Sequence, residues 1–385
     1  MLEEYKNFIL ITCKEIGFPE GILSLILEPE YIEIRNIPYE YEGKISTFRG
    51  IKVTHSLKIP FYLGPIRMKE NVNLDELKLL SLFTTWQSFL LNVPFSGISA
   101  GVEINETFIK NNKKRRFFTE KFISRINDNN VFFYPEMGYE EQDTFFYNFL
   151  GKVPEMGGIP QRREILKRGL KIILDKFSEI EDINFKKKRV LIHGAGKISL
   201  LFFEIMNEIN AEVIGISDSK GAIISDTIDY EKLLSLKKEK GSVKELDGKR
   251  ITNAEFVISE TDILVLCGSS NVINKNNFEK IKAKVIVEVA PSGINYEIYE
   301  ILLKDKKVLP DMIIGLPINL INSLEALRRY SPLFSGEDIK YYEDNLKNIF
   351  SDIYAFSVAK NKSLRLSAQM ISLYRFGRFL SHRGI

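Results

Sequence analysis

The stretch that decides the fold of this 385-residue chain reads Val190-Leu191-Ile192-His193-Gly194-Ala195-Gly196-Lys197-Ile198-Ser199. Its first four residues form a short apolar run, which is typical of a buried parallel strand. The glycines then predict a tight turn, and the apolar spacing over residues 198–209 predicts an amphipathic helix. A second apolar run follows at 211–216 and ends at Asp218. This strand–turn–helix–strand order predicts a doubly wound α/β domain.

The turn fits the dinucleotide-binding pattern G-x-G-x-x-G except in its last position, where Ser199 is a small substitute. The first glycine permits the turn, the second lets the backbone approach a pyrophosphate, and the helix N-terminus offers free N–H groups to the phosphates. Asp218 lies about 20 residues further on, where an acidic residue binds the ribose 2′-hydroxyl, which favours NAD over NADP. The residues that we expect to bind the cofactor are Gly194, Gly196, Lys197, Ile198, Asp218, Ser219 and Asn271. An alternative is a unit of the same shape whose phosphate site no longer binds a nucleotide.

The rest of the chain divides into two patterns. Half-buried strands, which alternate polar and apolar residues with a period of two, are predicted at 31–37 and 46–53. Fully apolar runs, which predict further parallel strands, come later, at 262–267 and 284–289. The change of pattern places a domain boundary near residue 186 and predicts a two-domain α/β protein.

Composition narrows the class of protein. The 54 basic and 51 acidic residues give a formal net charge of +3, so nothing suggests a nucleic-acid or membrane partner. The two cysteines, Cys13 and Cys267, lie far apart and form neither a disulfide framework nor a metal-ligand pattern, which favours a reducing compartment and no metal. The N-terminus has no signal-peptide pattern, and no apolar stretch reaches the roughly 18 residues of a spanning helix. We therefore expect a soluble cytoplasmic protein.

Several motifs carry a resemblance to a known family. In the first half of the chain Phe61–Arg67 looks like P-Y-K-G-G-x-R, Thr85–Gln87 like T-W-K, Asn92–Gly101 like N-x-P-x-G-G-x-K-G-G, and Tyr134–Gly138 like A-P-D-V-G. The agreement continues in the second half at Val213–Gly221, Leu309–Met312 and Leu364–Ile385. In this order the motifs resemble the glutamate dehydrogenase family, which includes the leucine, phenylalanine and valine dehydrogenases.

The resemblance implies a domain organisation, an activity and an assembly. It implies that residues 1–185 form a substrate and oligomerisation domain, completed by helices at about 340–385, and that residues 186–339 form a Rossmann dinucleotide-binding domain. It implies NAD- or NADP-dependent oxidative deamination of an amino acid to a 2-oxo acid, with the small-molecule ligand in the cleft between the domains. It also implies a homo-oligomer, and specifically a hexamer.

The chain departs from the family at the positions to which the resemblance assigns substrate chemistry. Three family lysines are replaced. The lysine that binds the side-chain carboxylate is Leu63 here, the lysine that binds the α-carboxylate is Gln87, and the catalytic lysine is Ser99. Three further positions differ. Glu136 replaces the family's proton-shuttling aspartate, Asn322 replaces its substrate-binding serine, and Pro291 replaces an asparagine near the nicotinamide.

These replacements differ in meaning. A leucine at position 63 changes specificity, because the leucine-type branch of the family resembles L-G-G there and takes apolar side chains. Ser99 has no accessible proton near neutral pH, and the loss of a positioned acid–base group typically costs about two to four orders of magnitude in rate. Gln87 can hydrogen-bond a carboxylate but cannot neutralise it. Glu136 remains as the acid–base candidate, and a small misalignment does not restore the lysine, since residues 95–103 contain none.

Two functions therefore stay open. One is a diverged dehydrogenase with weak or altered activity, whose cleft is lined by Leu63, Gln87, Ser99, Glu136 and Asn322. The other is a non-catalytic structural or regulatory homologue, a pseudoenzyme that binds a nucleotide or joins an active paralogue in a hetero-oligomer. Whether the chain is an enzyme is not decided by its sequence. His55 and His193 lack a partner pattern, and we expect both to be structural.

Overall fold

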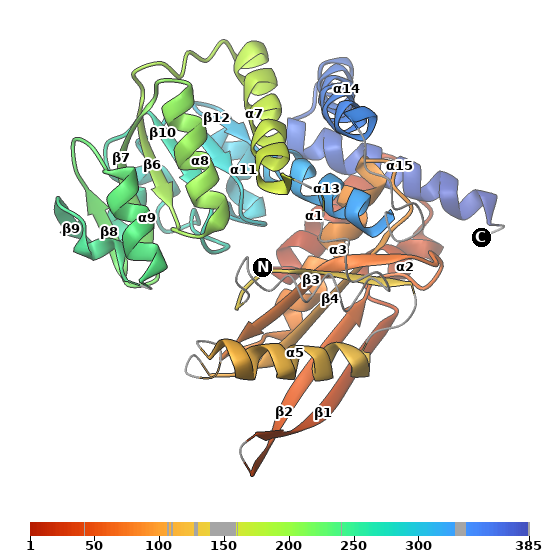
Figure 1. Ribbon diagram of the computed structural model, residues 1–385. Coiled ribbons are helices and arrows are strands. Elements are labelled where there is room, and N and C mark those ends of the chain that lie inside the picture. The colour runs from red at the N-terminus through yellow and green to blue at the C-terminus, as the bar shows by residue number, and fades with distance from the viewer. Residues whose placement is uncertain are drawn as a thin grey trace.

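The computed structural model describes residues 1–383 except 42, 106–107, 109–110, 127–129, 139–158, 160, 240 and 328–335. Within these residues the strands form one five-stranded and one seven-stranded sheet, and helices cover both (Figure 1). The first sheet is built from the N-terminal half of the chain and the second from the C-terminal half. The predicted two-domain α/β fold is thus confirmed, whereas the exact boundary near residue 186 stays a prediction.

The N-terminal sheet combines antiparallel and parallel strands. Its strands are β1 (Tyr31–Tyr41), β2 (Lys44–Thr54), β3 (Tyr62–Lys69), β4 (Ser96–Glu103) and β5 (Val131–Pro135). They lie in the order β1-β2-β4-β3-β5, in which β1, β2 and β4 pair antiparallel and β4, β3 and β5 pair parallel. The two runs with a period of two fall inside β1 and β2, so both predicted strands are present. Their burial does not alternate as expected for half-buried strands, because the outer part of β2 is exposed and Gly50–Thr54 are buried on both faces.

Helices pack on both faces of this sheet. On one face, Ile98 and Val102 of β4 share a core cluster with Phe118 of α5 (Asn112–Ile126). On the other lies α3 (Leu74–Leu90), so close that a Cβ added at Gly97 would lie 1.8 Å from the carbonyl oxygen of Ser81. Glycine at position 97 is therefore what allows α3 to sit directly on β4.

The C-terminal sheet is the doubly wound one. Its strands are β6 (Arg189–His193), β7 (Glu212–Asp218), β8 (Gly221–Ile224), β9 (Lys249–Ile251), β10 (Ile263–Leu266), β11 (Val285–Glu288) and β12 (Lys307–Leu309). The order β12-β11-β10-β6-β7 is parallel, and β8 and β9 extend it antiparallel. The chain reverses its direction across the sheet at β6, and such a reversal creates a ligand crevice at the carboxyl ends of the strands.

The remaining described helices pack on the C-terminal sheet or lie between the two sheets. They are α1 (Leu2–Glu15), α2 (Leu23–Leu27), α7 (Arg162–Glu181), α8 (Lys197–Glu208), α9 (Tyr230–Lys238), α10 (Asn253–Val257), α11 (Tyr296–Leu302), α12 (Asp311–Ile314), α13 (Leu316–Leu327), α14 (Gly336–Lys360) and α15 (Leu364–His382), with 3₁₀ turns at Glu20–Ile22, Val243–Glu245 and Phe278–Lys280. The C-terminal α15 returns to α3, where the ring of Phe376 lies 5.3 Å from that of Trp86. Arg375 of the same helix donates to the carbonyl oxygen of Leu90.

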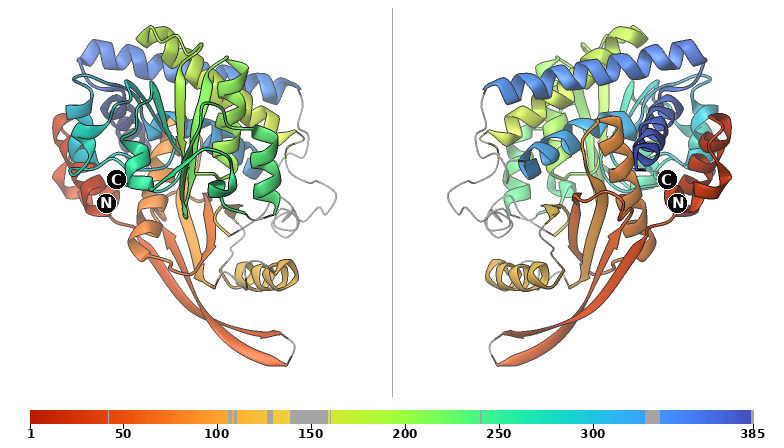
Figure 2. Two further views of the ribbon diagram at one scale, coloured as in Figure 1. Left: turned by 90° about the vertical axis from the view of Figure 1, so that its left-hand side faces the viewer. Right: turned by 90° about the vertical axis from the view of Figure 1, so that its right-hand side faces the viewer.

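The paired strands β1 and β2 project away from the body of the molecule as a two-stranded ribbon (Figure 2). Four large apolar side chains among the described residues of this ribbon are exposed: Tyr31 by 42%, Ile32 by 39%, Ile34 by 51% and Ile45 by 73%. A projecting edge strand with apolar side chains is a surface that soluble proteins usually cover.

Candidate functional site

The turn between β6 and α8 has the backbone that a dinucleotide needs. Gly194 has a φ of +103°, which favours glycine, and a Cβ there would lie 2.8 Å from the backbone nitrogen of Gly268. At Gly196, by contrast, an added Cβ would meet no atom within 4 Å. The backbone in front of the first turn of α8, which begins at Lys197, is therefore open. Open backbone before a helix N-terminus fits a pyrophosphate.

The residue in the third-glycine position ties this loop together. The Oγ of Ser199 accepts a hydrogen bond from the backbone nitrogen of Gly196 at 3.2 Å, and Ser199 is almost completely buried. Its side chain points back at the turn, so the serine fits between helix and strand as the glycine of the pattern does. Ile198, the next predicted contact, is half-buried in the same first turn.

Asp218 ends β7, and the chain itself already engages its carboxylate. It accepts hydrogen bonds from the backbone nitrogens of Lys220 at 2.8 Å and Val243 at 2.9 Å, and from Ser242 Oγ at 3.0 Å. A carboxylate offers about four acceptor positions. One position is thus left for a ribose hydroxyl, and the neighbouring Ser219 is exposed beside it.

Two more residues meet at this carboxyl edge of the sheet. Asn271 has a φ of +55° and donates its backbone N–H to the carbonyl oxygen of Ser292 at 2.7 Å, which joins the loops after β10 and β11. The ring of His193 packs against Gly268, where an added Cβ would lie 2.6 Å from Nδ1. Burial lowers the pKa of His193 to about 4, so its ring is neutral at pH 7. Loops from three adjacent parallel strands therefore converge in front of α8.

The second group of predicted residues begins under α3. Leu63 of β3 is paired with Gly97 of β4, which lies two residues before Ser99. The side chains of Leu63 and Ser99 are fully buried. Leu63 belongs to the core cluster that contains Trp86 of α3. Ser99 Oγ donates a hydrogen bond to the carbonyl oxygen of Leu77 at 2.7 Å. Its hydroxyl proton is therefore used to anchor α3.

Gln87 links α3 to the C-terminal half of the chain. Its Oε1 accepts a hydrogen bond from Asn319 Nδ2 at 3.4 Å, and its side chain lies against Gly315, at the junction of α12 and α13. The Gln87 side chain is buried, yet its Nε2 has no hydrogen-bond partner among the described residues. A buried amide donor without a partner costs about 1–3 kcal/mol, which a ligand with an acceptor oxygen would offset.

Asn322, one turn further along α13, is held by a residue that the sequence did not reveal. Its Oδ1 accepts a hydrogen bond from the guanidinium of Arg162, at the start of α7. Arg162 also forms an ion pair with Glu325 at 3.1 Å. The Nδ2 atom of Asn322 is fully buried and has no hydrogen-bond partner within the described part of the chain. The same is true of the Nε2 atom of Gln87. No local pattern could have shown this contact, because residues 162 and 322 are 160 positions apart.

Glu136, the acid–base candidate, is committed to an ion pair. Its backbone nitrogen donates to Ile66 at 3.1 Å, and its carboxylate pairs with Arg67 of β3, which also pairs with Glu76. Burial lowers the pKa of Arg67, but the carboxylates of Glu136 and Glu76 raise it more, so the guanidinium stays charged. The carboxylate of Glu136 is thus engaged by a guanidinium on the neighbouring strand β3.

Tyr134 is a further cleft residue that we did not predict. It stands where the A-P-D-V-G motif has alanine, and this replacement is the signal that could have revealed it. Burial and the nearby Glu136 raise the pKa of its phenol, whereas a hydrogen bond with Thr84 and the charges of Arg67 and Arg162 lower it. A bulky side chain therefore lies among groups from α3, β3 and α7.

Taken together, the residues predicted to bind the substrate include buried amides and an apolar side chain, with no lysine at the three positions assigned to one. No cluster of three or more His, Cys, Asp or Glu side chains that could bind a metal occurs in the part of the chain that the structure describes. None of its described helices has the length and apolar character needed to cross a membrane.

Comparisons with known proteins agree with this architecture. Residues 157–384 match the family model described as Glutamate/Leucine/Phenylalanine/Valine dehydrogenase, and residues 29–143 match the dimerisation domain of the same family. The chain is 28% identical to the NADP-specific glutamate dehydrogenase of Saccharolobus shibatae, over 98% of this chain and 92% of that protein. It is 29% identical to the glutamate dehydrogenase of Thermotoga maritima, over 94% and 93%. A subunit of the hetero-hexameric glutamate dehydrogenase of Thermus thermophilus, solved with leucine bound, superposes with a TM-score of 0.90 at 19% identity, over 100% and 97% of the two chains.

Proposed function

Because the chain belongs to the Glutamate/Leucine/Phenylalanine/Valine dehydrogenase family, as the resemblance predicted, we propose that it is a diverged dehydrogenase that deaminates amino acids weakly or with altered specificity. The observation that carries the proposal is the hydrogen bond from Ser99 to Leu77, at the position assigned to the catalytic lysine. A serine whose proton is donated to a helix carbonyl cannot act as an acid or a base on an amino acid. Glu136, paired with Arg67, is the acid–base group that remains.

The family uses NAD or NADP, and the open backbone at Gly196 supports binding of such a cofactor on the loops after β6, β7 and β10. When bound, the nicotinamide supplies the hydride acceptor. The chain's own contribution is to hold the pyrophosphate at the start of α8 and the ribose at Asp218. The free acceptor position of Asp218 favours NAD, because a 2′-phosphate would meet its negative charge.

The ligand that best suits the cleft is a small carboxylate with an apolar side chain. Gln87 Nε2 and Asn322 Nδ2 are donors for acceptor oxygens, and neither carries a charge. Leu63 and Tyr134 supply apolar surface where the family places a lysine and an alanine. This set supports weak binding of a leucine-like compound rather than of glutamate, whose second carboxylate would be left without a lysine.

The test is to restore the lysines. Formation of NADH or NADPH by the purified full-length chain is measured with a panel of amino acids, and we expect little or no turnover. The variant Gln87→Lys/Ser99→Lys should raise the rate by about ten-fold or more, since an acid–base group contributes two to four orders of magnitude. The variant Gln87→Met/Ser99→Met adds similar bulk without charge and should gain nothing. Wild-type turnover within the ordinary range of about 1–10³ s⁻¹ would refute the proposal.

A second candidate is a regulatory subunit that assembles with an active family member. The close match in fold to a subunit of a hetero-hexameric enzyme supports it, as do the exposed apolar side chains on the ribbon of β1 and β2. Light scattering gives the molar mass of the purified chain in solution, which distinguishes a regulatory subunit that is monomeric or dimeric alone from a homo-hexamer. A stable complex after co-expression with a lysine-containing family member, together with a chain that is monomeric or dimeric alone, would favour the regulatory subunit.

A further inference from the structure

The loop after β11 (residues 289–295) meets the loop after β10 at a residue with an unusual backbone. Ser292 has a φ of +56°, and its carbonyl oxygen accepts the hydrogen bond from Asn271, whose φ is +55°. Left-handed backbone is uncommon for residues other than glycine, and it persists only where the surrounding structure holds it in place. Asn271 is exposed at the carboxyl edge of the sheet, where we expect it to contact the cofactor. The groups that hold Ser292 therefore also set the position of Asn271.

Two side chains from outside the loop hold Ser292. Its backbone N–H donates to Asp311 Oδ2 at 2.8 Å, and its Oγ lies 3.1 Å from the hydroxyl of Tyr296. Asp311 is the first residue of α12, and Tyr296 is the first residue of α11. The N–H, the hydroxyl and the carbonyl oxygen of this buried serine are thus each engaged by a different segment of the chain.

Arg365, on the C-terminal helix α15, connects these holding groups. Its Nη2 forms ion pairs with Asp311 at 3.5 Å and with Glu288, the last residue of β11. Glu288 in turn accepts a hydrogen bond from the backbone nitrogen of Ile294 at 2.7 Å. The Cζ atom of Arg365 lies 4.8 Å from the centroid of the Tyr296 ring. One fully buried guanidinium therefore contacts the carboxylates on both sides of the loop and the tyrosine that holds its serine.

The burial of this arginine is not explained by packing alone. A buried ion pair is often no more stabilising than apolar side chains of the same volume, and one attested effect of buried polar groups is to select a single arrangement of the parts that they join. Arg365 reaches Glu288 across 77 positions, from a helix whose Phe376 packs on Trp86 of α3. The arginine thus ties the loop after β11 to the N-terminal half of the chain.

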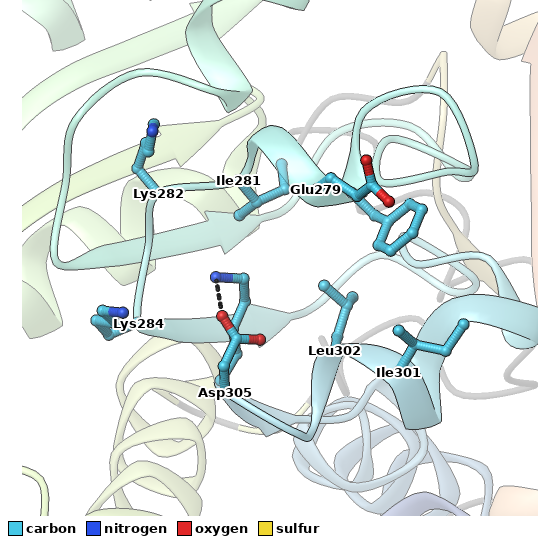
Figure 3. A pocket seen from close by; sticks show the side chains of 9 residues that line it. Glu279, Ile281, Lys282, Lys284, Ile301, Leu302 and Asp305 are labelled. Carbon is cyan, nitrogen blue, oxygen red and sulfur yellow. Dashed lines mark hydrogen bonds and ion pairs between the residues drawn. The ribbon is translucent and has the colours of Figure 1, made fainter.

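The first turn of α11 is the part of that helix that lies at the carboxyl edge. The helix runs back along the sheet, and its last residues, Ile301 and Leu302, line a cavity with Lys284 at the edge where the strands begin (Figure 3). Lys284 directly precedes β11, whereas Ser292 follows it. Tyr296 is therefore placed at the same edge as the turn between β6 and α8.

From these contacts we infer that Tyr296 and Arg365 are positioning residues for the cofactor, and this inference rests on the proposed binding of NAD or NADP in front of α8. Arg365 fixes Asp311 and the ring of Tyr296, and these two groups fix the N–H and the hydroxyl of Ser292. Ser292 then holds Asn271 at the carboxyl edge. Because Arg365 belongs to α15, the position of this cofactor contact depends on how the C-terminal helix is docked.

A pair of variants on α11 tests the role of Tyr296. Tyr296→Phe removes the hydroxyl that holds Ser292 and keeps the ring, whereas Tyr299→Phe removes a hydroxyl that has no hydrogen-bond partner among the described residues. Hydrogen exchange of the Asn271 amide and calorimetric titration with NAD are measured on the full-length chain. We expect Tyr296→Phe to speed the exchange about five-fold and to weaken NAD binding about three-fold, because one hydrogen bond is lost. Tyr299→Phe should change neither.

A second pair of variants, on α15, tests the ion pairs. Arg365→Met leaves two buried carboxylates without their cation, so exchange at Asn271 should be about a hundred-fold faster and NAD binding about ten-fold weaker. Leu373→Ala, at a buried position two turns further along the helix, loosens the packing of α15 without removing a charge. Both variants should lower the melting temperature, but Leu373→Ala should keep the wild-type exchange rate at Asn271 and the wild-type affinity for NAD.

Two outcomes would overturn the inference. One is an equal exchange rate at Asn271 in Tyr296→Phe and Tyr299→Phe, and this pair decides even if Arg365→Met does not fold. The other is an equal loss of NAD affinity in Arg365→Met and Leu373→Ala, which would show a general effect of stability. A wild type that does not bind NAD would instead refute the proposed cofactor site, and the exchange rates would then show by themselves whether Tyr296 holds Asn271.

Discussion

The loop in front of α8 and the floor of the interdomain cleft belong to the same chain but differ in what a ligand would touch. In the loop, the open surface at Gly196 is backbone. At the residues predicted to bind the substrate, the side-chain amide nitrogens of Gln87 and Asn322 are buried without partners among the described residues, and the three positions assigned to lysines carry other residues. The scaffold under the cleft is nevertheless tight, since α3 sits directly on Gly97. The fold and the chemistry of the cleft are therefore separable, because no lysine is needed to pack α3 on β4.

The largest expected effect is on stability, and it tests whether the packing of α3 on β4 requires glycine at position 97. In Gly97→Ala the new Cβ would lie 1.8 Å from Ser81 O and 2.8 Å from the backbone nitrogen of Thr85. Overpacking against backbone cannot relax cheaply, so we expect a loss of about 3 kcal/mol in the free energy of unfolding. Urea denaturation measures it. The control Gly196→Ala, in open space, should change it by less than about 0.5 kcal/mol.

If Gly97→Ala proved as stable as the control, α3 would be able to shift on β4. The cleft could then rearrange around a ligand, and its described geometry would not define its specificity.

The same contrast explains how much the sequence could predict. The turn at Gly194, the strands beside it and Asp218 follow from local spacing, because the strand–turn–helix unit is contiguous and its residue types are set by backbone geometry. The strands β1 and β2 follow likewise from a period of two, although their burial does not alternate between the two faces. These contacts join residues close together in the chain.

The parts that the sequence did not predict depend on contacts between distant residues. Arg162 reaches Asn322 across 160 positions, and Ser242 occupies the carboxylate of Asp218 from 24 positions away. Such pairs appear only when the chain is folded. The resemblance predicts an acid–base role for Glu136, which stays a prediction, whereas the ion pair of Glu136 with Arg67, on another strand, could not be predicted from the sequence.

The second prediction tests whether the turn between β6 and α8 binds the phosphates of NAD. Gly196→Ala places a methyl group where a pyrophosphate would approach, so the affinity for NAD should fall about ten-fold while the melting temperature stays the same. Isothermal titration calorimetry with NAD measures the affinity. Gly21→Ala, where an added Cβ also meets nothing within 4 Å, is the matched control and should bind as the wild type does. Equal affinities for both variants would mean that NAD binds elsewhere or not at all.

The third prediction concerns a buried carboxylate that supports the carboxyl edge. Glu288 accepts hydrogen bonds from the backbone nitrogens of Ile294 and Asp311 and pairs with Arg365. The pKa of Glu288 is raised to about 8, because burial and the nearby Asp311 raise it more than Arg365 and the hydrogen bond from Ile294 lower it. An unfolded glutamate has a pKa of about 4.3. Between these values the folded state keeps a proton that the unfolded state releases, so stability should fall as the pH rises from about 4.3 to about 8.

The slope of stability against pH is the measurement. We expect the free energy of unfolding to drop by about 1 kcal/mol per pH unit across this window, close to the limit for one proton. In Glu288→Gln this part of the slope should vanish, whereas Glu297→Gln, on the exposed start of α11, should keep it. A slope that persists in Glu288→Gln would show that another group titrates, and the loop would then depend on backbone packing without this carboxylate.

The smallest expected effect decides between NAD and NADP. Asp218 has one free acceptor position for a ribose hydroxyl, and a hydrogen bond to a charged group contributes about 1 kcal/mol more than a neutral one. Asp218→Asn should therefore weaken NAD binding about five-fold, and it should leave NADP binding unchanged or improve it, because the charge opposing a 2′-phosphate is removed. Asp226→Asn, an exposed carboxylate beyond β8, controls for net charge. Equal losses for both nucleotides would mean that Asp218 acts only through Ser242 and Val243, as a brace for the loop, and the cofactor preference would then reside in side chains outside the G-x-G-x-x-G pattern.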